Sequence, residues 1–182
     1  MNRNIRDKQP NTTPSVTGPL TDHFQGDILP TEGRLAGIDL GTVRVGVAVC
    51  DPSQKWTSPC ETWHRQPGKE ESYFRELVRR ESIVGFVVGL PLHNSGRESE
   101  ISLAVRKFAL WLKDTLLVPV ALFDERFSSA HAAHLLTDMG ATNKRRKERL
   151  DQLAAHVILE AYLESNRTLH RGPNPIDDHQ KE

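Results

Sequence analysis

Residues 37–49, GIDLGTVRVGVAV, contain two short apolar runs separated by Gly41 and Thr42. This pattern predicts a buried strand, a tight turn and a second strand paired with the first. One acidic residue, Asp39, interrupts the first run. Strand interiors are depleted in Asp, and an unpaired buried carboxylate is costly or takes up a proton. The apolar run around Asp39 contains no cation, so we expect the compensating charge to come from elsewhere in the chain.

Hydrophobic periodicity and turn residues predict the remaining elements. The predicted strands cover residues 34–40, 44–50, 56–63, 83–88 and 118–123, and the predicted helices cover 70–81, 98–115, 128–139 and 144–164. The first three strands form a meander, and the later alternation of helix and strand requires parallel crossovers. We therefore expect an α/β fold with a mixed five-stranded sheet, made of a three-stranded antiparallel meander plus two parallel strands, with helices on both faces.

The chain has 182 residues, a length that suits one domain. Residues 1–33 and 166–182 are polar and without period, so we expect a disordered N-terminal extension, a folded domain over 34–165 and a polar C-terminal tail. No apolar stretch reaches the roughly 20 residues of a membrane span or forms a signal peptide. We expect a cytoplasmic protein without membrane contact, with reduced thiols at Cys50 and Cys60.

Three acidic residues occupy positions where they could converge. Asp39 lies in the first strand, Glu125 follows the last strand directly after Asp124, and Asp151 flanks the apolar stripe of the last helix. Ligands of open α/β sheets bind at strand ends. Carboxylates brought together repel each other, and a hard cation such as Mg²⁺ or Mn²⁺ resolves the repulsion. Two such ions about 3.5–4 Å apart can stabilise the attacking and leaving oxygens of a phosphodiester displacement. For Asp151 taken alone, an ordinary surface role is the simpler interpretation.

Basic residues precede Asp151 in the last helix: Lys144, Arg145, Arg146 and Lys147. Cations at a helix N-terminus oppose the macrodipole, which favours a use in phosphate contact over a merely solvated surface. Arg44 and Arg126 are further candidates for phosphate contact. For each of these two, a structural ion pair with Asp39 or Glu125 is an equal alternative.

Four blocks of the chain together resemble one family. GIDLGTVRVGVAVCD, VVGLPLHNSGRESE, VALFDERFSSAHAAHLL and DQLAAHVILEAYL are similar to the signature blocks of the YqgF (RuvX) proteins, described as Holliday-junction resolvases and as the pre-16S rRNA processing nuclease. The resemblance implies an RNase H-like fold and a divalent-metal nuclease site. It maps Asp39, Glu125 and Asp151 onto the acidic residues of that site. Its implied partners are structured RNA or branched DNA.

Other functions are compatible with parts of the sequence. The stretch Gly37–Thr42 is also similar to the first phosphate loop of actin-like ATPases, but those enzymes need two such domains and a second phosphate loop. A non-catalytic RNA-binding factor of ribosome assembly, retaining only the fold, is a third class. Junction resolution requires two sites, so a homodimer would favour it, whereas a monomer would favour RNA processing.

Overall fold

A computed structural model describes residues 26–91, 99–124 and 143–170, with side chains from 147 to 167 in the last range. The elements are β1 (Arg34–Leu40), β2 (Arg44–Cys50), β3 (Thr57–His64), α1 (Glu70–Glu81), β4 (Ile83–Leu90), α2 (Glu100–Leu116), β5 (Val120–Asp124) and α4 (Asn143–His170). The bounds predicted for β1, β2 and α1 are confirmed, and the others differ by a few residues. The helix predicted over 128–139 lies outside the described residues.

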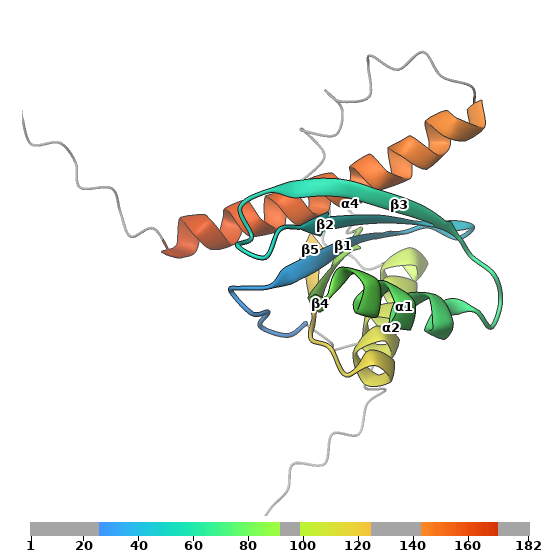
Figure 1. Cartoon of the computed structure of the whole chain (residues 1–182). Helices are drawn as coiled ribbons and strands as arrows, with labels where there is room; N and C mark the ends of the chain where they lie inside the picture. The colour runs from blue at the N-terminus through green and yellow to red at the C-terminus, as the bar shows by residue number, and fades with distance from the viewer. Residues whose placement is uncertain (1–25, 92–98, 125–142, 171–182) are drawn as a thin grey trace, which may run out of the picture.

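The five strands form one mixed sheet in the order β3-β2-β1-β4-β5 (Figure 1). β1 pairs antiparallel with β2, and β2 with β3, whereas β4 is parallel to both β1 and β5. The predicted α/β fold is therefore confirmed. The meander and two parallel strands form the RNase H-like arrangement, which brings the carboxyl ends of β1, β4 and β5 to one edge of the sheet.

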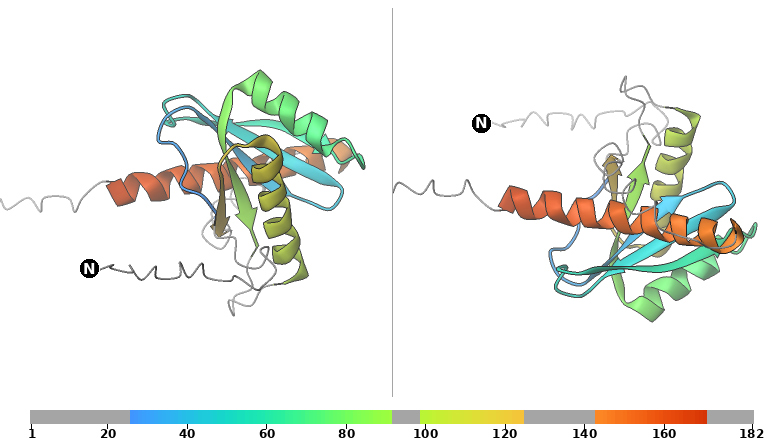
Figure 2. Two further views of the ribbon diagram at one scale, coloured as in Figure 1. Left: turned by 90° about the horizontal axis from the view of Figure 1, so that it is seen from below. Right: turned by 90° about the horizontal axis from the view of Figure 1, so that it is seen from above.

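Helices cover both faces of the sheet, with α1 and α2 on one side and α4 on the other (Figure 2). Alternate residues of β1 enter two separate cores. Ala36 and Ile38 pack toward α1 and α2, whereas Leu35 packs toward α4. The period of two therefore also directs Asp39 toward α4. None of the helices in the described ranges combines the length and apolar character that a membrane span needs.

The folded part reaches further in both directions than residues 34–165. Gly26 bridges to Ala121 of β5, the Asp27 carboxylate accepts a hydrogen bond from the Val120 N–H at 3.0 Å, and Leu29 is buried in the core beneath α4. Residues 26–33 were predicted to belong to the extension because their apolar residues are few and show no period. At the other end α4 continues to His170.

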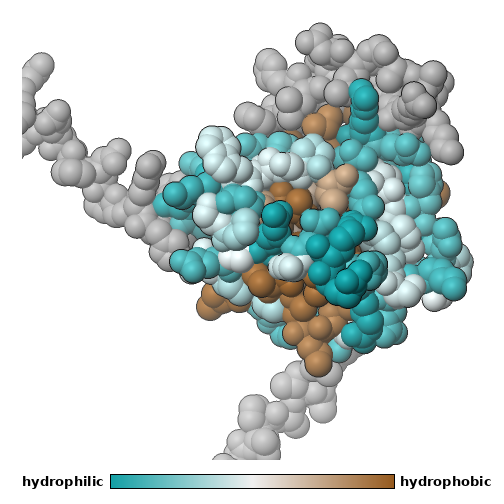
Figure 3. Space-filling view, in the orientation of Figure 1, coloured by the Kyte–Doolittle hydropathy of each residue, from teal (hydrophilic) through white to brown (hydrophobic). Residues whose placement is uncertain are grey.

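The outer surface of α1 is charged. Arg75 pairs with Glu71 at 2.8 Å and Arg79 with Glu76 at 2.6 Å, and Figure 3 shows hydrophilic side chains over this face. Apolar side chains gather below them, toward the end of α2. The predicted thiols are free, with Cys50 buried and Cys60 half-buried.

Candidate active site

Asp39 occupies the second-last position of β1, on the face covered by α4. It is half-buried and lies opposite Gly46 of β2 in the antiparallel register. Gly37 lies two residues earlier on the same face, where it meets α4 at Ala155 and Leu159. The prediction that a carboxylate enters the body of this sheet is confirmed.

Two glycines allow α4 to lie directly on the sheet. A Cβ atom on Gly46 would stand 2.0 Å from the backbone oxygen of Asp151, and one on Gly37 would stand 2.6 Å from that of Ala155. Side-chain atoms do not approach backbone oxygens so closely, so only glycine permits this packing. Because Gly46 is the partner of Asp39, its contact with Asp151 brings residues from distant parts of the sequence to one place.

The two carboxylates influence each other electrostatically. Burial and, to a lesser extent, the nearby negative charge of Asp151 together raise the pKa of Asp39 from 3.8 to about 6. At neutral pH Asp39 is therefore mostly ionised, although its burial and the charge of Asp151 both disfavour the ionised form. A bound cation would relieve both the burial and the repulsion.

Arg44 forms an ion pair with Asp151, through its Nε and the Oδ2 of the carboxylate. Asp39 and Glu125 were the structural partners expected for Arg44 from the sequence, and that expectation is wrong because Asp151 is the partner. Arg44 opens β2 on the same face as Gly46, which places its side chain beneath the first half of α4. The pair holds Asp151 toward the end of the sheet, and Asp39 receives no cation from it.

The third predicted acid, Glu125, and the basic candidate Arg126 lie outside the described residues. Asp124, the alternative to Glu125, is the last residue of β5 and is half-buried. It is on the same face as Leu122, which packs against the core of α1 and α2. By the alternation of a strand, Asp124 therefore faces away from α4 and from Asp39.

The basic run falls in the first turns of α4. Residues 144–146 are helical, but their side chains are not among those described. Lys147 and Arg149 are exposed. Glu148 between them binds β3, because the Thr62 hydroxyl donates to its backbone oxygen at 2.7 Å and its carboxylate lies 3.1 Å from His64 Nε2.

Sequence reasoning missed one further cation near Asp39. Arg65 follows β3 and donates from Nη1 to the Gly41 carbonyl at 3.3 Å, while its backbone N–H donates to the Val43 carbonyl at 3.0 Å. Its only sequence signal was a position just after a strand. The pairing of Arg44 with His64 in neighbouring strands brings Arg65 to the turn that follows Asp39.

The donor set suits a hard divalent cation in kind, since Asp39 and Asp151 offer carboxylate oxygens at the edge of a sheet. Within the described ranges, no three His, Cys, Asp or Glu side chains gather closely enough to hold a metal ion. The described part of the site therefore contributes two acids, one of them with a raised pKa that a cation would lower.

The matching family model, RuvX, described as Holliday junction resolvase, covers residues 33–165. A protein of Rhodopirellula baltica is 45% identical over 150 residues, which cover 82% of this chain and 87% of that protein. A protein of Syntrophomonas wolfei subsp. wolfei is 38% identical over 133 residues, 72% of this chain and 94% of that protein. Both relatives carry the name "Putative pre-16S rRNA nuclease". Among solved structures, T. thermophilus RuvC in complex with Holliday junction substrate gives a TM-score of 0.49 at 16% identity, covering 73% of this chain and 96% of that chain.

The family match contains all five strands of the sheet and α4 as far as residue 165. It also contains Asp39, Glu125 and Asp151, the three acids on which the sequence analysis centred. Both relatives share more than a third of their residues with this chain over most of its length. The chain therefore belongs to the RuvX family of Holliday junction resolvases.

Proposed function

We propose that this protein is a Mg²⁺- or Mn²⁺-dependent nuclease that hydrolyses a phosphodiester bond of structured nucleic acid, with the precursor of 16S rRNA as its substrate. One observation carries the proposal: Asp39 and Asp151 are brought together at the edge of the sheet, and burial and repulsion raise the pKa of Asp39 to about 6. An acid with an ordinary surface role would be neither buried in this way nor placed beside a second carboxylate. The names of the two relatives support the choice of RNA substrate.

Asp39 and Asp151 would hold the metal, with Glu125 as the third ligand. Glu125 is preferred to Asp124 because the strand alternation directs Asp124 toward α2. A bound divalent ion supplies the Lewis acid and the activated water that hydrolysis of a phosphodiester requires. The chain's own contribution is to fix the acids. Gly46 sets the distance of α4 from the sheet, and Arg44 orients the Asp151 carboxylate.

A Holliday junction is the second candidate substrate, favoured by the description of the matching family model. Resolving a junction requires two cuts, so this activity predicts a homodimer with two sites, whereas RNA processing needs only one. Sedimentation of the full chain, combined with cleavage of both substrates, separates the two. A monomer that cuts only the RNA would exclude junction resolution.

The test of catalysis compares the wild-type chain with Asp39→Asn and Asp151→Asn on a labelled precursor RNA and on a four-way DNA junction, in Mg²⁺, in Mn²⁺ and in EDTA. Asp114→Asn, an exposed carboxylate on α2, is the matched control. We expect both site variants to bind the nucleic acid yet lose cleavage, and the control to cut normally.

Three outcomes would contradict this proposal. Full activity of Asp151→Asn would remove that residue from the site. Binding of RNA without metal-dependent cleavage, in the wild type and the variants alike, would instead indicate a binding factor of ribosome assembly. Tight ATP binding at physiological concentration would indicate the actin-like class.

A further inference from the structure

Positive side chains gather at the end of the sheet that carries Asp39. Four of them lie among the described residues and form what we call the basic rim: Arg44, Arg65, Lys147 and Arg149. Two contacts bring the last two to this end, since Thr62 and His64 at the end of β3 both bind Glu148. The rim is therefore assembled from β2, the residue after β3, and the first turns of α4, at the upper right of Figure 1.

The members of the rim are neutralised to different degrees. Arg44 is committed to Asp151. Arg65 lies 4.0 Å from the nearest Glu70 oxygen, the outer limit of an ion pair, and its side chain is 33% exposed. Lys147 and Arg149 are exposed and have no acidic partner within the described part of the chain. Charge available to a ligand is therefore concentrated on Arg65, Lys147 and Arg149.

Arg65 has donors to spare. A guanidinium carries five N–H groups, and Nη1 donates to the Gly41 carbonyl two residues beyond Asp39. This hydrogen bond holds one terminal nitrogen of the guanidinium against the β1–β2 turn and leaves the edge formed by Nε and Nη2 for a ligand. A fork held in this way is suited to bind a phosphate through two parallel hydrogen bonds.

The acids alone would repel a nucleic acid, so binding requires cations that flank them. We propose that Arg65, together with Lys147 and Arg149, binds the phosphate backbone of the nucleic-acid substrate. Arg65 contacts it beside the β1–β2 turn, and the two α4 residues contact it above the end of β3, where Thr62 and His64 bind Glu148. This inference rests on the proposed function. It assigns phosphate contact to Arg65 and Arg149, which were not among the basic residues expected from the sequence to contact phosphate.

The test measures binding of a fluorescently labelled RNA hairpin by the full chain, in EDTA to prevent cleavage, over a series of KCl concentrations. Loss of one phosphate contact lowers the slope of log Kd against log [KCl] by about 0.7 to 0.9. We expect this change for Arg65→Gln, with about a tenfold rise in Kd. With metal present, KM should rise while kcat stays near the wild-type value, because Arg65 is not proposed to contact the reacting atoms.

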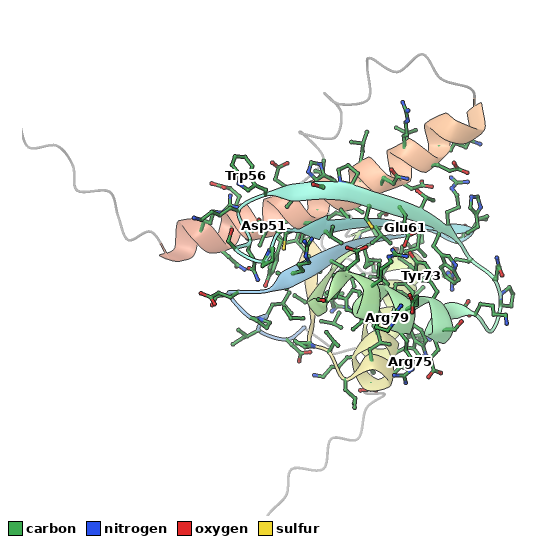
Figure 4. All side chains as sticks on the ribbon, viewed as in Figure 1. Asp51, Trp56, Glu61, Tyr73, Arg75 and Arg79 are labelled. Carbon is green, nitrogen blue, oxygen red and sulfur yellow. The ribbon has the colours of Figure 1, made fainter. Side chains whose placement is uncertain are left out.

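The matched control is Arg75→Gln. Arg75 is an exposed arginine in an ion pair on α1, on the opposite face of the sheet from α4 (Figure 4). It should leave the slope and Kd unchanged. Arg65→Lys keeps the charge but loses the fork, so its slope should remain while Kd rises. The double variant Lys147→Gln with Arg149→Gln changes only exposed side chains and should lower the slope by about twice as much as Arg65→Gln.

An unchanged slope in both Arg65→Gln and the double variant would overturn the inference. So would a fall in kcat of Arg65→Gln at constant slope, which would reduce Arg65 to a structural support of the turn. An equal effect of Arg75→Gln would show a general charge effect, with the same consequence. Failure of the proposed function has a different signature, because the wild type would then bind the hairpin with these slopes and not cut it.

Discussion

Asp39 is expected to destabilise the metal-free protein at neutral pH. Burial, assisted by the charge of Asp151, raises its pKa from 3.8 to about 6. Each tenfold change in the acid constant corresponds to about 1.4 kcal/mol, so the ionised residue costs the folded state about 3 kcal/mol. Asp39→Asn has nearly the same shape and no charge. We expect it to raise the free energy of unfolding by up to this amount at pH 7.

The sign of the pH dependence follows from linkage. Well below pH 4, Asp39 is protonated in both the folded and the unfolded chain, so the variant and the wild type should be equally stable there. Between pH 4 and 6 the unfolded chain ionises first, and the wild type loses stability relative to Asp39→Asn as the pH rises. Above pH 6 the difference should be constant.

Urea unfolding followed by tryptophan fluorescence, in EDTA at pH 4, 5, 6, 7 and 8, measures this difference. Asp114→Asn provides the comparison for an exposed carboxylate and should show no such trend. Adding Mn²⁺ at pH 7 should stabilise the wild type more than Asp39→Asn. The reasoning would be refuted if Asp39→Asn were less stable than the wild type at pH 7, or if the difference were the same at pH 4 as at pH 7.

Three further substitutions test the packing around the site. Gly46→Ala places a Cβ 2.0 Å from the Asp151 backbone oxygen, so we expect a loss of about 3 kcal/mol or more in urea unfolding together with lost cleavage; a stable, active variant would contradict the close approach of α4. Leu29→Ala empties a buried position and should cost about 2–5 kcal/mol in the same assay, whereas a neutral effect would mean that residues 26–33 do not pack as described. Asp51 accepts hydrogen bonds from the Ser53 hydroxyl and from the backbone N–H groups of Ser53, Lys55 and Trp56, which hold its pKa below the ordinary value. Asp51→Ala should therefore lower the Tm at pH 7 by more than it does in strong acid, and calorimetry at both pH values measures the two changes. An equal fall in Tm at both would contradict the role given to the ionised Asp51 carboxylate.

The sequence predicted the strands and helices because their patterns are local. Alternation in Val45–Val49 and the helical spacing of α1 can each be read within a dozen residues. The proximity of Asp39 and Asp151 could also be predicted from the sequence. Sheet topology restricts where strand ends can meet, and an acid in an apolar strand needs a compensating partner.

The parts that sequence reasoning missed depend on contacts between distant segments. Gly46 looked like an ordinary small residue of an apolar strand, and only its contact with α4 reveals its purpose. Arg44 pairs with Asp151 because of where α4 lies along its axis over the sheet, which the sequence does not show. Leu29 is buried whereas the adjacent apolar Ile28 is exposed, and this short apolar pair shows no period that would predict which of the two is buried.

Among the contacts that attach the helix α4 to the sheet, two lie near the ends of the region that packs on it. Asp151 is fixed near its beginning by Gly46 and Arg44, and Arg167 near its end donates to the Gln54 and Lys55 carbonyls at 2.8 and 3.0 Å. The second attachment is the β2–β3 turn, where Figure 4 shows Asp51 and Trp56 at the opposite end of the sheet from the start of α4.

At 1.5 Å per residue these attachments are about 24 Å apart, and each residue turns the helix by about 100°. Adding or removing one residue between them would turn the Asp151 carboxylate away from Asp39 as long as the far end stayed attached. The number of residues in this interval is therefore part of the active site, although most of them touch nothing in it. Exposed positions such as Glu160 can be substituted there, whereas neither the buried positions nor the length can change.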